Sequence, residues 1–158
     1  MMNMITPPPL LALQQRLVDR LLTVLPEDAL LWDPEDTIPY ECDGLAAFKQ
    51  MPLAVALPQT ENQVVGILKV CYELQIPVVP RGAGTGLSGG AMPLENSLVL
   101  SLAKLKKIVH IDPTARIATV QPGVRNLAIS EAVAHLGLYY APDPSSQIAC
   151  SIGGNVSE

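Results

Sequence analysis

Five glycines within ten residues, directly after an apolar segment, constrain the fold of this chain more than any other part of its sequence. They lie in Arg81-Gly82-Ala83-Gly84-Thr85-Gly86-Leu87-Ser88-Gly89-Gly90, immediately after Pro80. Glycine permits positive φ and has no Cβ, so successive backbone N–H groups can turn toward an anion and approach it closely. The pattern predicts a phosphate-binding loop, in which the Arg81 guanidinium and the Thr85 and Ser88 hydroxyls are further donors.

Two common nucleotide motifs do not fit this loop. Gly84 to Gly89 has the G-x-G-x-x-G spacing of nicotinamide-dinucleotide sites, but that motif opens a helix, and Pro93 and Asn96 prevent a helix here. A P-loop is excluded because the chain has no Gly-Lys-Ser/Thr. A flexible surface loop would account for the glycines but not for the lead-in Pro80-Arg81 or the hydroxyls, so we prefer the phosphate interpretation.

The first third of the chain is predicted to be a helix followed by an irregular arm. Apolar residues recur at helical spacing from Leu10 to Leu25, and Pro26 ends the pattern. The stretch from Pro26 to Gln50 is rich in Pro, Asp and Gly, which is typical of a connecting segment. We therefore divide the chain into an amino-terminal arm, residues 1–50, and a binding domain, residues 51–158.

A β-α-β unit is predicted just before the glycine loop. Leu53 to Leu57 and Ile76 to Val79 have the composition of strands, and Thr60 with Gln63 predicts a capping box that begins the helix between them. Such a unit makes a right-handed crossover between parallel strands. The helix is expected to bury one stripe of side chains, namely Val64, Ile67, Leu68, Cys71 and Leu74.

The residues after Asn96 predict a second, mainly antiparallel lobe, so the fold class is α+β with a small parallel β-α-β lobe beside it. Asp112-Pro113-Thr114-Ala115 has the composition of a hairpin turn, and Gly137 suits the left-handed position that ends a helix. The elements expected in this lobe are strands at 97–102, 107–111 and 116–121, a helix at 124–136 and a short strand at 138–141.

Composition excludes several classes of protein. At 158 residues the chain is the size of one domain, and its net charge of −5 argues against a nucleic-acid surface. Lys104, Lys106 and Lys107 are interpreted as a solvated turn. The three cysteines lack the spacing of a disulfide framework or a zinc site, so no metal site is predicted. No signal peptide or membrane span is predicted, since polar residues interrupt the first leucines.

A second bend-forming region lies near the end of the sequence. It contains Pro142-Asp143-Pro144-Ser145-Ser146, which by itself is as typical of a surface turn as of a site, and Ser151-Ile152-Gly153-Gly154-Asn155. The paired glycines offer a second place where backbone can approach a ligand closely. Two such segments in one chain favour an elongated ligand that is held along its length.

Together these motifs resemble those of the flavin-linked oxidases and dehydrogenases of the vanillyl-alcohol-oxidase family. The resemblance begins near Pro39 and includes Tyr40 to Leu45, the glycine loop, Gln121 to Arg125 and Tyr139 to Asn155. It implies the PCMH-type FAD-binding fold, with FAD held non-covalently because Thr85 stands where some relatives carry a flavin-linked histidine. The residues that it implies around FAD are Pro80, Arg81, Gly82, Ala83, Gly84, Thr85, Gly86, Ser88, Gly89, Pro122, Gly123, Pro144, Ser145, Ser146, Ile152, Gly153, Gly154 and Asn155.

The resemblance also implies a reaction, the removal of a hydride from the α-carbon of a small 2-hydroxy acid of the glycolate type to give a 2-oxo acid. No catalytic residue is assigned. His110 and His135 are interpreted as structural, and Arg125 is only a candidate ligand of the substrate carboxylate. The alternative function is a non-catalytic nucleotide-binding or assembly module that keeps the phosphate cradle.

Members of this family continue well beyond the motifs found here. We therefore expect the chain to be an amino-terminal fragment, with an incomplete second lobe, that binds FAD weakly and is inactive alone. The resemblance further implies partner subunits, including an iron–sulfur protein. It also implies a location in the cytoplasm or at the surface of the inner membrane.

Overall fold

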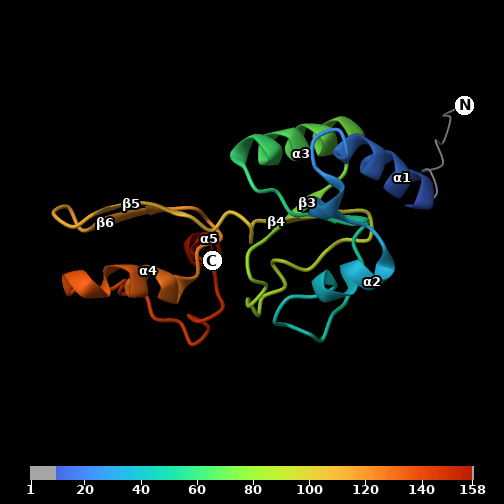
Figure 1. Ribbon diagram of the computed structural model, residues 1–158. Helices are drawn as coiled ribbons and strands as arrows, with labels where there is room; N and C mark the ends of the chain where they lie inside the picture. The colour runs from blue at the N-terminus through green and yellow to red at the C-terminus, as the bar shows by residue number, and fades with distance from the viewer. Residues whose placement is uncertain (1–9, 158) are drawn as a thin grey trace, which may run out of the picture.

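Helices α1 (Leu10–Leu21) and α3 (Glu61–Leu74) cover one face of a four-stranded sheet in the computed structural model, which describes residues 10–157 (Figure 1). The sheet has the order β1-β2-β4-β3, and its strands are β1 (Leu30–Leu31), β2 (Ala54–Ala56), β3 (Val78–Arg81) and β4 (Leu98–Ser101). β2 and β3 each pair in parallel with β4, and β1 pairs antiparallel with β2. The predicted parallel lobe is therefore confirmed.

The core of this lobe lies between the sheet and the two helices. Leu17 and Leu21 of α1, Ile67 of α3 and Leu98 of β4 are all fully buried there. At roughly 25 cal/mol for each Å² of apolar surface, each such side chain stabilises the fold by about 2 kcal/mol. A continuous core of this kind gives the sheet edges that carry the glycine loop a rigid support.

The helix α3 begins as its sequence predicts. Thr60 accepts a hydrogen bond from the Gln63 backbone N–H, and the Gln63 side chain accepts from the Thr60 backbone N–H at 3.2 Å, which completes the capping box. The predicted buried stripe is only partly correct. Leu68 is 45% exposed, whereas Val70 is buried, because the buried face of the helix is centred on Ile67, Val70 and Cys71.

The predicted irregular arm contains regular structure. It holds β1, α2 (Pro34–Thr37) and two short 3-10 helices at Glu27–Ala29 and Ile38–Tyr40. β1 is too short to show strand periodicity, and it forms only because Leu30 and Leu31 pair with Ala56 and Val55. An edge strand made by so few residues depends on its neighbour and leaves no pattern in its own sequence.

The strand predicted to begin the antiparallel lobe, residues 97–102, was assigned to the wrong lobe. It forms β4, which lies in the middle of the parallel sheet. All four residues of β4 are buried. A strand covered on both faces has a continuous apolar run in place of alternation, and Leu98-Val99-Leu100 is such a run.

The second lobe consists of a hairpin and two helices, drawn in yellow to red in Figure 1. Strands β5 (Ile108–Asp112) and β6 (Ile117–Val120) pair antiparallel as predicted, and Asp112 Oδ1 accepts from Thr114 and Ala115 N–H in the turn. Helix α4 (Asn126–Val133) continues into a 3-10 turn, Ala134–Leu136, that ends at Gly137 with φ +69°. Helix α5 (Ile152–Ser157) lies where the two lobes meet.

The short strand predicted at residues 138–141 does not form. Between residues 10 and 157 no strand lies alongside this segment, so its backbone has no ladder to join. The Tyr140 N–H instead donates to Ser130 Oγ of α4 at 2.9 Å. The mixture of parallel sheet, antiparallel hairpin and helices confirms the predicted α+β class. None of the helices described is long and apolar enough to cross a membrane.

Candidate functional site

The glycine loop leaves the carboxyl end of β3 and lies on the side of the sheet away from α1 and α3 (Figure 1). Among the residues described, no backbone N–H group from residue 83 to residue 91 donates a hydrogen bond to the protein. Several of these residues, including Thr85 and Gly86, are half-buried. Folded proteins pair almost all such donors, so a run of unpaired N–H groups in one place is a site for an anion or for ordered water.

Three of the loop glycines border open space. A Cβ added to Gly86, Gly89 or Gly90 would find no atom within 4 Å. Gly89 also has φ of +76°, which residues with a side chain rarely adopt. The backbone at these positions is thus bare toward space that a ligand can enter.

Two other loop glycines are covered by the protein itself. A Cβ at Gly82 would collide with Ser151 Oγ, and a Cβ at Gly84, where φ is +71°, would collide with the Arg81 guanidinium. The first contact joins the glycine loop to the carboxyl-terminal segment. Internal packing therefore requires glycine at these two positions, whether or not a ligand is bound.

The Arg81 guanidinium makes its contacts within the protein. Its Nη1 donates to the Cys42 carbonyl at 2.6 Å, and its Cζ lies 5.5 Å from the centre of the Tyr40 ring. Sequence reasoning assigned this side chain to phosphate binding. The geometry places it between the glycine loop and the segment that follows α2.

The second glycine segment packs on the residues that follow the hairpin. Ile152 N–H donates to Val124 O at 2.8 Å, and Gly153 N–H donates to Pro122 O at 2.9 Å. A Cβ at Gly153 would lie 2.9 Å from Pro122 Cβ, and a Cβ at Gly123 would lie 2.7 Å from Leu105 O. These close contacts bring together two predicted site segments, 122–123 and 152–153, and the N–H groups of Gly123, Ile152 and Gly153 are all paired within the protein.

The remaining predicted residues are dispersed around the start of α4. The Asn155 side chain accepts from Asn126 Nδ2 at 3.2 Å, and that amide also donates to Pro142 O. Asn126 is 1% exposed and forms a buried hub that sequence reasoning did not detect. Ser146 lies half-buried in the turn that follows Pro144, and Ser145 is exposed. Arg125 Nη1 donates to Ile148 O at 3.3 Å, which is a structural contact.

Two buried polar atoms at the site have no hydrogen-bond partner among the residues described, Asp43 Oδ2 and Ser151 Oγ. Asp43 is 7% exposed and Ser151 is 5% exposed. Neither was predicted as a site residue. Asp43 directly precedes Gly44, which is the only signal that the sequence carries for it. Ser151 has no such neighbour, and its contact with Gly82 depends on a residue far away in the chain.

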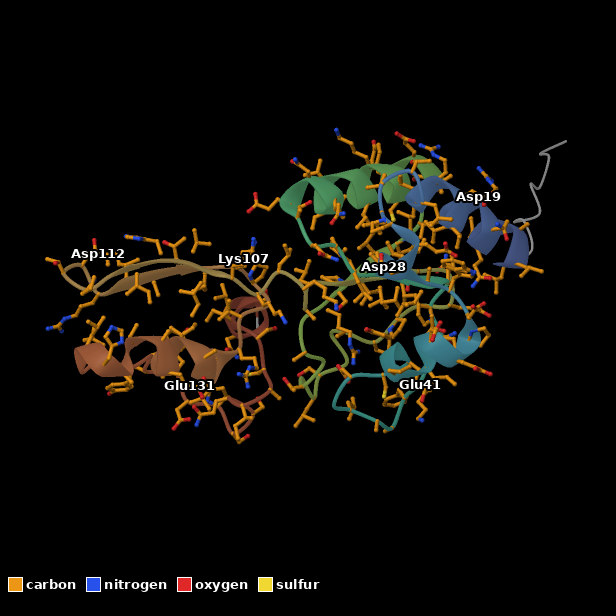
Figure 2. The ribbon with its side chains drawn as sticks, viewed as in Figure 1. Asp19, Asp28, Glu41, Lys107, Asp112 and Glu131 are labelled. Atoms are coloured by element: carbon orange, nitrogen blue, oxygen red, sulfur yellow. The ribbon has the colours of Figure 1, made fainter. Side chains whose placement is uncertain are left out.

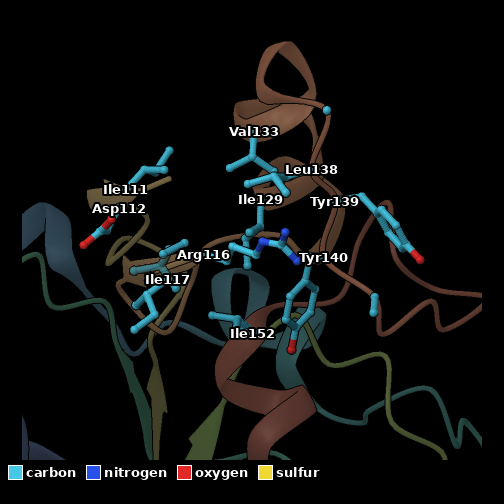
Figure 3. Close-up of a pocket in the computed structure, with 14 residues that line it drawn as sticks. Ile111, Asp112, Arg116, Ile117, Ile129, Val133, Leu138, Tyr139, Tyr140 and Ile152 are labelled. Carbon is cyan, nitrogen blue, oxygen red and sulfur yellow. The ribbon is translucent and has the colours of Figure 1, made fainter. Parts of the chain in front are cut away.

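A cavity of about 770 Å³ lies elsewhere, between the hairpin β5-β6 and α4 (Figure 3). Its walls include Ile117, Ile129, Val133 and Tyr140, with the Arg116 side chain reaching into the middle. Ile152 is the one predicted site residue among its lining. Within residues 10–157, no group of His, Cys, Asp or Glu could hold a metal ion.

A glycine-rich backbone with unpaired donors, carried at the end of a parallel strand and joined to a second, antiparallel lobe, defines the class of this molecule. Residues 52–158 match the FAD binding domain family, and the chain belongs to that family. The domain is therefore an FAD-binding domain, as the resemblance of its motifs implies.

The similar curated proteins are flavin-linked oxidoreductases. The chain is 64% identical over 129 residues to glycolate oxidase subunit GlcD of Escherichia coli (strain K12), which covers 82% of this chain and 26% of that protein. It is 44% identical over 119 residues to the subunit of the same name from Bacillus subtilis (strain 168), and the match covers 75% of this chain and 25% of that protein. D-2-hydroxyglutarate dehydrogenase of Xanthomonas citri pv. viticola is 36% identical over 152 residues, and the match covers 96% of this chain and 30% of that protein. The chain thus spans about a quarter to a third of these relatives.

Solved structures confirm the PCMH-type fold. 4-Ethylphenol oxidase from Gulosibacter chungangensis matches with a TM-score of 0.81 at 22% identity, over 93% of this chain and 29% of that one. p-Cresol methylhydroxylase matches with a TM-score of 0.71 at 26% identity, over 80% of this chain and 25% of that one.

The residues present fit FAD. The dinucleotide needs donors for its pyrophosphate oxygens, and the unpaired N–H groups of residues 83–91 are such donors. It also needs backbone without side chains where it passes closely, which Gly86, Gly89 and Gly90 provide. The chain's own surface thus meets both demands at one place, the glycine loop.

Proposed function

We propose that this chain is the FAD-binding part of a flavoprotein that oxidises a small 2-hydroxy acid of the glycolate type to the 2-oxo acid. The observation that carries the proposal is the run of unpaired backbone donors at residues 83–91 beside open glycines. The names of the relatives, two glycolate oxidase subunits and a D-2-hydroxyglutarate dehydrogenase, support the class of substrate. When bound, FAD supplies the redox chemistry by accepting a hydride from the substrate α-carbon.

The chain's own residues would bind and orient the cofactor. In this proposal the backbone N–H groups from Ala83 to Gly90 bind the pyrophosphate, and the Thr85 and Ser88 hydroxyls donate beside them. Pro122 and Gly123, with the segments 144–146 and 152–155, lie along the rest of the cofactor. Substrate-binding and catalytic groups remain unassigned.

We further propose that FAD is held non-covalently. Thr85 offers no imidazole to the flavin, and the two histidines lie on the second lobe, His110 on β5 and His135 in the 3-10 turn after α4. We keep the boundary between arm and binding domain at residues 50 and 51. The pairing of β1 with β2 joins the two parts across this boundary, since β1 lies in the arm and β2 in the binding domain.

The relatives' description as subunits supports the proposal of partner subunits. The iron–sulfur partner rests on the family resemblance alone, as does a location in the cytoplasm or at the surface of the inner membrane. Purification of the protein from membrane and cytosolic fractions of its native cells tests the iron–sulfur partner and the location. The expected result is an iron-containing partner in the eluate, and a protein that elutes alone from membrane and cytosolic fractions contradicts the proposal.

Titration with FAD tests the central claim. The purified chain is expected to quench flavin fluorescence on binding, and acid precipitation should leave the flavin in the supernatant because no covalent bond holds it. The same protein, supplied with glycolate and a reducible dye in its native assembly, is expected to reduce the dye. A chain that is folded by circular dichroism and leaves flavin fluorescence unchanged would contradict the proposal, and would favour a module that binds another nucleotide.

A further inference from the structure

Arg81 ties the start of the glycine loop to a distant segment of the chain. Its Nη1 donates to Cys42 O at 2.6 Å, and its guanidinium stacks on the Tyr40 ring at 5.5 Å. It also covers the α-carbon of Gly84, where a Cβ would collide with it. Hydrogen bonding and a cation–π contact together fix the planar guanidinium in one orientation. We call the segment that it holds, Tyr40–Leu45, the strap.

The strap lies directly on the carbonyl groups of the loop. A Cβ at Gly44 would stand 2.8 Å from Gly86 O and 3.0 Å from Thr85 O, so these two carbonyl groups face the strap. A trans peptide places its carbonyl oxygen and its N–H on opposite sides. The N–H groups of Gly86 and Leu87 therefore point away from the strap.

The strap has a defined shape of its own. Asp43 Oδ1 accepts from the Leu45 N–H at 2.9 Å, which forms a turn around Gly44. Gln50 N–H donates to Glu41 O at 2.9 Å and closes the loop that follows. Lys49 pairs with Glu41 at 2.6 Å, and this hydrogen bond raises the pKa of Lys49. Glu41 marks this part of the molecule in Figure 2. A segment with these internal bonds can act as a rigid support.

We propose that Arg81 is a positioning residue that clamps the strap against the glycine loop, and that the strap directs the loop N–H groups toward the phosphates of FAD. The inference rests on the proposed FAD-linked function and deepens it. In this proposal Arg81 does not contact the phosphate directly, since its guanidinium acts through Tyr40, Cys42 and Gly84. Charge alone is then insufficient at position 81, and the planar fork is required.

Two substitutions of Arg81 distinguish clamping of the strap from a direct contact with phosphate. Arg81→Lys keeps the charge and loses the fork, whereas Arg81→Met loses both; Arg16→Met, at an exposed arginine on α1, is the matched control. FAD affinity is measured by flavin fluorescence at several salt concentrations. Clamping predicts that both Arg81 variants bind FAD roughly tenfold more weakly, with the salt dependence of the native protein, and that the control is unchanged. Native affinity in Arg81→Lys, with a weaker salt dependence in Arg81→Met, would overturn the proposal.

A double-mutant cycle with Tyr40→Leu provides the second measurement. If Arg81 acts through Tyr40, the variant with both changes should lose about as much FAD affinity as Arg81→Met alone. Losses that multiply would show two independent contributions and overturn the clamp. Circular dichroism without FAD confirms that each variant is folded, and Tyr40→Phe, which keeps the ring, is the control and should bind FAD normally. Failure of the native protein to bind FAD would instead contradict the proposed function.

Discussion

The hydroxyl of Ser151 lies against the α-carbon of Gly82, so the carboxyl-terminal segment touches the first glycine of the loop. Ser151 also forms an isolated bridge with Arg125, which ties the same residue to the start of α4. Its Oγ is buried and has no hydrogen-bond partner among residues 10–157. One residue thus connects the two lobes at the edge of the candidate site, and it leaves a hydroxyl unpaired there.

Replacing Ser151 with alanine should stabilise the protein in the absence of FAD. A buried hydroxyl without a partner costs about 1–3 kcal/mol, and alanine removes it while leaving the Cβ in place. We expect the free energy of unfolding in urea to rise by about 1 kcal/mol. Ser157→Ala is the control, because that hydroxyl donates to Gly153 O at 2.8 Å and its loss should not stabilise. A less stable Ser151→Ala would show that the hydroxyl has a partner.

Gly86→Ala should separate ligand binding from folding. The new Cβ meets no atom of the protein within 4 Å, and Gly86 does not have a positive φ, so the melting temperature should stay within about 1 °C of the native value. The same methyl group enters the space proposed for FAD. We expect FAD affinity, measured by fluorescence titration, to fall at least roughly tenfold. A variant that binds FAD normally would place the cofactor elsewhere.

Gly123→Ala should destabilise the junction between the lobes. Its Cβ would collide with Leu102 O and lie 2.7 Å from Leu105 O, and backbone atoms cannot move aside as a side chain can. Overpacking of this kind costs about 1–3 kcal/mol, which urea denaturation can measure. Gly90→Ala is the matched control, since nothing lies within 4 Å of its added Cβ. Equal stability of the two variants would be evidence against a close-packed junction.

Cys71 should make stability depend on alkaline pH. Burial raises the pKa of its thiol from the ordinary 9.0 to about 11. Above pH 9 the unfolded chain loses this proton while the folded chain keeps it, so the free energy of unfolding falls as pH rises from 9 toward 11. Below pH 9 both states hold the proton and the effect vanishes. Urea denaturation at pH 8, 9, 10 and 11 measures the slope, and Cys71→Ala should flatten it; an unchanged slope would assign the effect to other groups.

Local patterns predicted the parts of the fold that local chemistry determines. The capping box at Thr60, the turn at Asp112 and the left-handed Gly137 each involve neighbours in sequence, and all three are confirmed. Pairing between distant strands left weaker signals. β4 was assigned to the wrong lobe although its unbroken apolar run is typical of a central strand, and β1 has no pattern apart from its partner β2.

The candidate site likewise has features that the local sequence predicts and features that depend on contacts between distant segments. The glycine loop follows from composition alone, because a segment with so many residues that lack a Cβ is suited to close approach of its backbone to a ligand. What the glycines pack against could not be read from composition. Gly82 faces Ser151 and Gly153 faces Pro122, and such contacts between distant segments depend on how the two lobes meet. The contact between Arg81 and Tyr40 could not be read from the sequence either, because the position of Tyr40 depends on a turn that the arm's sequence does not reveal.

The position of β4 in the sheet bears on how the chain is made. β2 and β3 each pair with β4 and not with each other, so the parallel sheet has no parallel pairing until residues 98–101 exist. While residues up to Ser101 are still inside the ribosome, the glycine loop has already been synthesised, but the parallel sheet beside it cannot yet form. We expect that lobe to be cleaved by protease on stalled ribosomes until β4 emerges, and to resist cleavage afterwards. The phosphate cradle is therefore synthesised before the strand that holds it in place.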